Sequence, residues 1–127
     1  MREVRVLIVD DSSVMRKIVE RSLRQAGLDP MVVLEAASGV EGLDALKKES
    51  VHLILSDINM PSMDGLEFLR QLRAQKLAEA IPVVMITTES SEEYVKTAIH
   101  CGAQGYIRKP FTSEQVKERI LPLLSIF

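Results

Sequence analysis

Five short apolar runs alternate with five amphipathic stretches along this chain, and the alternation limits the fold more than any other feature. The apolar runs predict strands at residues 4–9, 31–36, 51–56, 82–86 and 104–108. The amphipathic stretches predict helices at residues 13–26, 39–48, 64–75, 91–101 and 112–124. Strict alternation favours parallel strands joined by right-handed helical crossovers. The first, third and fourth runs lack polar alternation, which is typical of strands covered on both faces.

The helix starts carry a recurring capping signal that supports this order of elements. In each of four pairs, a residue able to cap a helix is followed three positions later by an acid or an amide. The pairs are Ser38 with Glu41, Asp64 with Glu67, Ser90 with Glu93, and Thr112 with Gln115. Helical spacing also predicts which residues face the sheet. In the first three helices these are Val14, Ile18, Val19, Leu23, Val40, Leu43, Leu46, Leu66, Leu69 and Leu72.

Size and composition fit one domain, residues 1–127, that needs no disulfide or structural zinc. Hydrophobic residues make up 46% of the chain and charged residues 27%, which are ordinary values for a globular protein. The net charge of −2 gives no electrostatic case for binding nucleic acid or an anionic membrane. The single Cys101 excludes an internal disulfide, and no apolar stretch resembles a membrane span or a signal peptide. We therefore expect a cytoplasmic protein.

Two of the predicted strands lead into aspartate. The run at 4–9 is followed by Asp10 and Asp11, and the run at 51–56 is followed by Asp57. If these strands are parallel neighbours, their carboxyl ends lie side by side and the three carboxylates converge. At about 4–5 Å and an effective dielectric of about 20, each like-charge pair costs roughly 3–4 kcal/mol. Such a cluster requires a cation or a proton, and its oxygen ligands favour a hard ion such as Mg²⁺.

Polar residues also follow the last two strands, namely Thr87 after the fourth and Lys109 after the fifth. The most specific segments are VDDS at 9–12, DINMPSMDG at 57–65 and GYIRKPF at 105–111. In this order and spacing they resemble the receiver domain of two-component response regulators, over essentially the whole chain. The resemblance implies a flavodoxin-like (βα)5 three-layer α/β sandwich, with a five-stranded parallel sheet in the order 2-1-3-4-5.

The resemblance also implies a role for the acids and the lysine. Asp57 would be the nucleophile that accepts a phosphoryl group from a phosphohistidine on a sensor kinase. Asp11, Asp57 and the backbone carbonyl of Asn59 would bind Mg²⁺ directly, and Asp10 would hold a metal-bound water. Lys109 would place a positive charge on a phosphoryl oxygen. On this interpretation the chain is a signalling domain that assists its own phosphorylation and dephosphorylation, and not an enzyme with a separate substrate.

Four further residues are implicated in switching and in the lifetime of the phosphorylated state. Thr87 would donate its hydroxyl to the phosphoryl group, and Tyr106 would turn inward as Thr87 moves. Asn59 and Glu89, which lie two positions after the acceptor and the threonine, would tune dephosphorylation. This pair resembles that of fast-cycling, chemotaxis-type, single-domain receivers. Thr88 is bulkier than the small residue that commonly follows the threonine in this family. A bulkier residue narrows access to the site, so the sequence does not decide whether dephosphorylation is fast.

The expected partners are a sensor histidine kinase and a downstream effector protein. The effector would dock on the face formed by the predicted elements at 91–101, 104–108 and 112–124. A partner that binds the active conformation more tightly than the inactive one shifts the equilibrium toward the active conformation. The difference between the two affinities sets the size of the shift. We expect no direct contact with nucleic acid or membrane. We also expect a monomer, with phosphorylation-dependent dimerisation left open.

The sequence leaves three alternatives. The chain could be a receiver excised from a larger response regulator or hybrid kinase. Residues 57–59 faintly resemble the nucleophile motif of Mg²⁺-dependent haloacid-dehalogenase phosphatases, but Asn59 cannot supply their second acid and the chain has no room for a cap. A metal-independent pseudoreceiver is disfavoured because every site residue is present. His52 and His100 are expected in surface or capping roles and not as a metal pair.

Overall fold

The computed structural model describes residues 3–28, 30–58, 60, 63–77, 80–87, 92–109 and 111–124, with only the main chain described at Thr87 and Glu92. Within these ranges, five strands alternate with five α-helices. The strands are β1 (Val4–Val9), β2 (Met31–Ala36), β3 (Leu53–Asp57), β4 (Val83–Thr87) and β5 (Gly105–Arg108). The helices are α1 (Ser13–Gln25), α2 (Gly39–Lys48), α3 (Gly65–Ala74), α4 (Glu92–His100) and α5 (Ser113–Arg119), and a 3-10 turn, η1 (Leu121–Leu124), follows the last.

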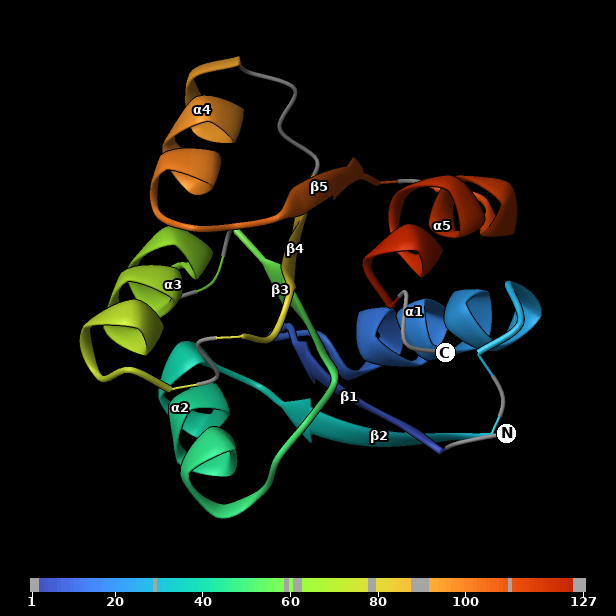
Figure 1. Cartoon of the computed structure of the whole chain (residues 1–127), viewed down its shortest axis with the longest axis horizontal. Coiled ribbons are helices and arrows are strands. Elements are labelled where there is room, and N and C mark those ends of the chain that lie inside the picture. The colour runs from blue at the N-terminus through green and yellow to red at the C-terminus, as the bar shows by residue number, and fades with distance from the viewer. Residues whose placement is uncertain are drawn as a thin grey trace.

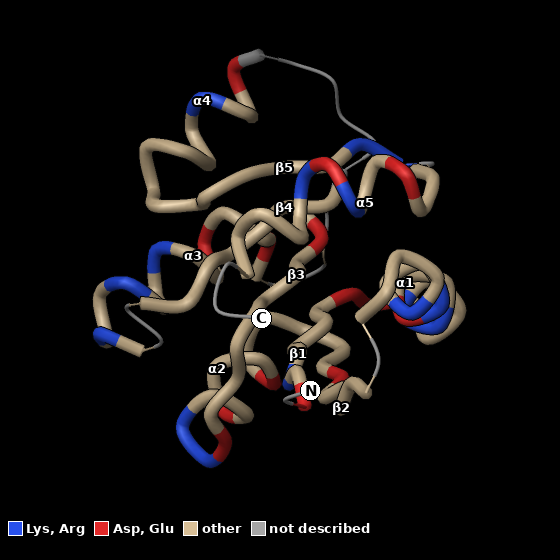
Figure 2. Tube along the Cα trace, turned by 45° about the vertical axis from the view of Figure 1, so that its right-hand side comes forward, with Lys and Arg blue, Asp and Glu red and all other residues tan. Residues whose placement is uncertain are grey.

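The strands form one parallel sheet in the order β2-β1-β3-β4-β5 (Figure 1). Helices α1 and α5 cover one face of this sheet, and α2, α3 and α4 cover the other (Figure 1). The predicted α/β fold and its strand order are confirmed. Charged positions lie mostly on the helices and near strand ends, while the strands are largely uncharged (Figure 2). In the described ranges, no helix combines the length and apolarity needed to cross a membrane.

The core lies in two layers because successive strand residues point to opposite faces. In β1, Val6 and Ile8 pack with the residues of α1 and α5, whereas Leu7 and Val9 pack with those of α2 and α3. All four side chains are at most 1% exposed. This burial on both faces explains why the strand carries no polar alternation.

Two rows of apolar residues run along α1, and only one of them faces the sheet. Val19 and Leu23 are each 1% exposed, as predicted, but Val14 and Ile18 are 68% and 47% exposed. The prediction that Val14 and Ile18 face the sheet is therefore wrong. Each of them precedes a sheet-facing position by one residue, which places it about 100° away around the helix. The same error applies to Val40 on α2, which is 60% exposed.

Strands β3 and β4 begin later than predicted, for identifiable reasons. His52 lies before β3, where its Nδ1 accepts the Arg5 N–H (2.9 Å) and its own N–H donates to the Arg5 carbonyl (2.8 Å). Pro82 lies before β4 because it has no N–H for the sheet, although its carbonyl accepts from the Ile54 N–H (3.0 Å). Both strands also end one residue later than predicted, so Asp57 and Thr87 are the last residues of their strands and do not follow them.

Three of the four predicted caps are present, and the fourth involves Ser90, which lies outside the described residues. The Thr112 pair is a full capping box, since Thr112 Oγ1 accepts from the Gln115 N–H and Gln115 Oε1 accepts from the Thr112 N–H. The helix predicted to reach about residue 124 ends at Arg119. Pro122 explains this, because its ring would collide with the carbonyl four residues earlier in a continued α-helix. The chain passes instead into η1.

Candidate functional site

Asp10 and Asp57 meet at the carboxyl ends of β1 and β3. The two strands are parallel neighbours, with Val9 beside Ser56, so the next residue of each lies at the same edge of the sheet. Carboxylate oxygens of Asp10, Asp11 and Asp57 all lie within 4.8 Å of one another. Asp10 and Asp57 are buried, with 3% and 7% exposure, and Asp11 is exposed. The three carboxylates therefore converge, as the strand pattern predicts.

Lys109 brings a positive charge to this cluster from the far end of the chain. It directly follows β5, and its Nζ lies 3.2 Å from Asp10 Oδ2 and 3.5 Å from Asp57 Oδ2. The Lys109 side chain is 11% exposed, so water screens these contacts poorly. One ammonium thus contacts both buried acids at once.

The acidic corner after β1 is fixed by local hydrogen bonds. The Asp10 N–H donates to the Ala36 carbonyl (3.0 Å), which extends the pairing of β1 with β2 by one residue. Asp10 Oδ1 accepts the Ser12 N–H (2.9 Å), and Ser12 Oγ accepts the Met15 N–H (3.2 Å) to cap α1. Asp10 therefore shapes the turn and also contributes to the carboxylate cluster. The Ser12 cap was not predicted, because Met15 gives no acid or amide at the third position.

The segment after Asp57 passes so close to α3 that it requires glycine. The Gly65 N–H donates to the Ile58 carbonyl (2.8 Å), which holds the start of α3 against the end of β3. A Cβ on Gly65 would lie 2.2 Å from the Asp57 carbonyl oxygen. Any larger residue would push α3 away from the acceptor strand. The sequence motif contains this glycine, but its contact with Asp57 is visible only in the structure.

The charge of the site favours a divalent cation. With each carboxylate ionised, three negative charges and the Lys109 ammonium leave a net charge of −2. At the observed separations, each pair of carboxylates repels by roughly 3–4 kcal/mol at an effective dielectric of about 20. Carboxylate oxygens are hard ligands that suit Mg²⁺, which keeps several of its own waters and needs few protein ligands. The residues present therefore fit a Mg²⁺ site.

Several predicted site residues have no described side chain. Asn59 and Glu89 lie outside the described residues, as does Pro110. The main chain of Thr87 ends β4 beside Arg108, but its side chain is not among those described. The roles of Asn59, Thr87 and Glu89 stay predictions.

Tyr106 lies on β5 beside Met85 and is half-buried against the core layer of α2, α3 and α4. The Arg119 guanidinium of α5 lies over its ring, 5.3 Å from the centroid. A cation over an aromatic face is attracted by the ring's quadrupole. No sequence pattern predicts this pair, because the two residues share no motif.

A parallel sheet in the order 2-1-3-4-5, with acids at the ends of β1 and β3 and a lysine after β5, defines a receiver-type signalling domain. The chain belongs to the response regulator receiver domain family, whose model matches residues 6–121. Membership implies phosphorylation-dependent two-component signalling. Receiver domains in general depend on Mg²⁺ and interact with histidine kinases and downstream effectors.

Similar proteins include chemotaxis regulators. The chain is 44% identical over 122 residues to a chemotaxis protein CheY homolog of Campylobacter jejuni, which covers 95% of this chain and 92% of that protein. The structure of the chemotaxis response regulator CheY4 of Vibrio cholerae matches with a TM-score of 0.84 and 36% identity, covering 97% of this chain and 100% of that one. A CheY-like receiver domain protein from Methanospirillum hungatei matches with a TM-score of 0.84 and 32% identity, covering 98% and 96%.

Proposed function

We propose that Asp57 accepts a phosphoryl group from a phosphohistidine of a sensor kinase and that the modification switches the signalling state of residues 1–127. The observation that carries this proposal is the convergence of Asp10, Asp11 and Lys109 on Asp57. An Asp57 carboxylate oxygen attacks phosphorus, the bond from phosphorus to the histidine nitrogen breaks, and the departing imidazole takes up a proton. The product is an acyl phosphate on Asp57.

Mg²⁺ is the proposed cofactor, and it would offset charge on the phosphoryl oxygens when bound. Asp11, Asp57 and the Asn59 backbone carbonyl would hold it directly. Asp10 would contribute through a water molecule. This division is supported by the bonds of Asp10, whose two carboxylate oxygens already accept from the Ser12 N–H and the Lys109 ammonium. Asp11 is the exposed member of the cluster and is open to an arriving ion.

Lys109 and Thr87 would respond to the new charge. A phosphoryl group adds about −1.5 to −2 charges at neutral pH, by analogy with other phosphorylated residues. The Lys109 ammonium, now 3.5 Å from Asp57, would move to a phosphoryl oxygen, and the Thr87 hydroxyl would donate to another. Because Thr87 ends β4 and lies beside β5, its movement would change the position of Tyr106 on β5.

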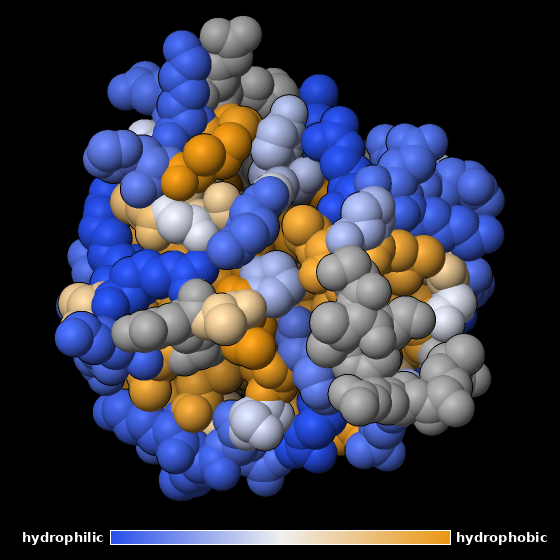
Figure 3. Space-filling view, in the orientation of Figure 1, coloured by the Kyte–Doolittle hydropathy of each residue, from blue (hydrophilic) through white to orange (hydrophobic). Residues whose placement is uncertain are grey.

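The surface of α4, β5 and α5 is the proposed docking face for a downstream effector. Two apolar side chains of α4 are exposed, Tyr94 at 42% and Ile99 at 54%. Apolar surface over α4 is visible in the space-filling view (Figure 3). Exposed apolar groups on α4 offer a partner surface to bury, and a change in the position of the half-buried Tyr106 of β5 would alter the docking face. The proposed state of the chain is a monomer.

Asn59 and Glu89 are proposed to set the lifetime of the acyl phosphate. The amide of Asn59 would hold the attacking water and the carboxylate of Glu89 would assist, so that water displaces Asp57 from phosphorus and releases phosphate. Replacing both residues by leucine should slow this decay without preventing phosphorylation. Loss of label after removal of the donor measures the rate. An unchanged rate in the double variant would show that these residues play no such role.

Phosphorylation by a small-molecule phosphodonor tests the proposed acceptor. With Mg²⁺, intact-mass measurement should show one added phosphoryl group on the wild type and none on Asp57→Asn. Asp44→Asn is the matched control, because Asp44 is an exposed acid on α2 that pairs with Lys48 outside the cluster. It should be labelled like the wild type. Equal labelling of wild type and Asp57→Asn would contradict the proposal.

A further inference from the structure

Arg16 of α1 binds the acidic corner through the main chain. Its Nη1 donates to the Asp10 carbonyl oxygen at 2.6 Å, and its Nε donates to Glu35 Oε1 at 2.9 Å. The Arg16 side chain is only 14% exposed, and its bond to the Asp10 carbonyl is partly buried, whereas its bond to Glu35 is exposed. Arg16 is no part of the carboxylate cluster, yet it bonds to the main chain of one member, Asp10.

The bond to the Asp10 carbonyl matters because of the peptide to which that oxygen belongs. The Asp10 carbonyl lies in the planar unit that joins Asp10 to Asp11. Fixing its oxygen fixes the plane, which contains the nitrogen and Cα of Asp11, and so fixes the position from which the Asp11 side chain leaves the backbone. The Asp10 N–H is already held by the Ala36 carbonyl. Arg16 therefore completes a main-chain clamp on the corner that presents both acids.

Glu35, near the end of β2, anchors the other side of the guanidinium. Lys17 Nζ also contacts this carboxylate, at 3.0 Å. Hydrogen bonds from Lys17 and Arg16 hold the pKa of Glu35 below its usual range, against the effect of its partial burial. A guanidinium is planar and has several fixed donors, so it can bond Glu35 and the Asp10 carbonyl together, whereas a lysine offers a single point charge.

We propose that Arg16 is a positioning residue for the metal site, holding the Asp10–Asp11 peptide in the orientation that lets Asp11 and Asp57 share one cation. The inference rests on the proposed function, because it takes the carboxylate cluster to be a Mg²⁺ site. Mutating a group that hydrogen-bonds to a metal ligand commonly lowers metal affinity about 10- to 100-fold. Because Arg16 acts through the main chain, we expect a loss near the lower end of that range, about tenfold.

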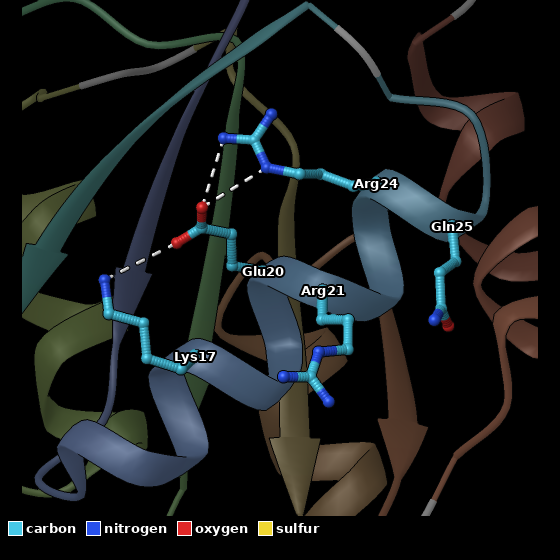
Figure 4. A pocket seen from close by; sticks show the side chains of 5 residues that line it. All are labelled: Lys17, Glu20, Arg21, Arg24 and Gln25. Atoms are coloured by element: carbon cyan, nitrogen blue, oxygen red, sulfur yellow. Dashed lines mark hydrogen bonds and ion pairs between the residues drawn. The ribbon is translucent and has the colours of Figure 1, made fainter.

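Arg24 provides a matched control on the same helix. Within the described residues, its guanidinium likewise bonds to a glutamate and to a main-chain carbonyl, Glu20 Oε2 at 3.1 Å and the Met31 carbonyl at 3.2 Å. Figure 4 shows Arg24 and Lys17, both on α1, directed at Glu20. Met31 begins β2, at the opposite end of the sheet from the acids. Removing Arg24 thus breaks comparable bonds with no path to the cluster.

The test is a Mg²⁺ titration of the wild type, Arg16→Gln and Arg24→Gln, followed by amide chemical shifts and calorimetry. Arg16→Gln should weaken Mg²⁺ binding about tenfold, whereas Arg24→Gln should stay within about twofold of the wild type, because it is remote from the site. The Ser12 amide shift should change in metal-free Arg16→Gln, since its N–H donates to Asp10 Oδ1. Arg16→Lys should lie between Arg16→Gln and the wild type.

The outcomes separate this inference from the proposed function. If the wild type binds no Mg²⁺, the proposed metal site is wrong and the role of Arg16 falls with it. If the wild type binds and Arg16→Gln matches Arg24→Gln, whether both are unchanged or both are weakened, the positioning role alone is overturned. If Arg16→Gln does not fold, the same comparison is decided by Arg16→Lys and Glu35→Gln. Each of these should bind more weakly than Arg24→Gln, and equality would overturn the role.

Discussion

The ammonium nitrogen of Lys109 lies 3.2 Å from Oδ2 of Asp10, although ninety-nine positions separate the two residues in the chain. Asp10 directly follows the first strand and Lys109 directly follows the last. Their contact therefore forms only when the whole sheet has assembled with β3 and β4 between β1 and β5. The same ammonium lies 3.5 Å from Asp57, so one side chain offsets two buried acids.

Lys109→Gln should lower the free energy of unfolding in the absence of Mg²⁺ by about 1–3 kcal/mol, because it leaves two buried carboxylates without their cation. Added Mg²⁺ should restore part of the loss. Chemical denaturation of the variant with and without the ion measures both effects. Lys117→Gln is the control, since Lys117 is 47% exposed and lies 3.9 Å from Glu114. Equal stability of the two variants would contradict this account of the site.

Mg²⁺ should raise the melting temperature of the wild type and leave that of Asp11→Ala nearly unchanged. An ion that binds only the folded state stabilises it by mass action, by about 2.7 kcal/mol at one hundred times its dissociation constant. Asp11→Ala removes one ligand and also relieves repulsion within the cluster, so its metal-free form should melt no lower than the wild type. Thermal melts across a Mg²⁺ series would show both effects. The same Mg²⁺-dependent rise in both proteins would mean that Asp11 does not bind the ion.

The sequence was sufficient for the strand order and for the convergence of the acids. The alternation of apolar runs, with glycine ending α1 at Gly27, predicts the elements, and the resemblance supplies their order. Gly27 has a φ of +108°, which few other residues adopt. Parallel neighbours place their carboxyl ends together, so Asp10 and Asp57 could be paired once the resemblance made their strands neighbours. The lysine was assigned through its motif, since spacing in the chain says nothing about a contact across the sheet.

Other features depend on three-dimensional packing that no local pattern encodes. Val14 and Ile18 are as apolar as Val19 and Leu23, and only the placement of α1 on the sheet decides which row is covered. Arg16 bonds to the main-chain carbonyl of residue 10. Every amino acid has this carbonyl, so the identity of residue 10 does not reveal the bond. The approach of Gly65 to Asp57 depends in the same way on backbone geometry.

Thr87→Ala should allow phosphorylation but uncouple it from Tyr106. Without the hydroxyl, the end of β4 has no side-chain donor that can bond to the phosphoryl group. The end of β4 therefore does not move, and the adjacent β5 is not displaced. Amide shifts on adding beryllofluoride and Mg²⁺ should spread over α4, β5 and α5 in the wild type and stay near Asp57 in the variant. Shifts centred on α1 and α2 in the wild type, with Tyr106 unmoved, would show that the proposed docking face is wrong.

The ion pair of Glu35 should contribute stability at neutral pH and lose that contribution in acid. Bonds from Lys17 and Arg16 lower the pKa of Glu35 in the folded chain below its ordinary value of 4.5. Since the folded chain then binds its proton less readily than the unfolded chain, the contribution is fully present above the ordinary value and disappears as the pH falls through the lowered pKa. The difference in unfolding free energy between wild type and Glu35→Gln should therefore shrink in this range. A difference that grew on acidification would contradict the pairing.

Whether Asp57 is the acceptor is tested most directly by locating the phosphoryl group after reaction with a phosphodonor and Mg²⁺. Borohydride reduces an acyl phosphate on aspartate to the alcohol of homoserine, which marks the modified position for peptide sequencing by mass spectrometry. We expect homoserine at position 57 alone, and none when the donor is omitted. Homoserine at position 10, 11 or 64, or a phosphoryl group that resists borohydride, would show that Asp57 is not the acceptor.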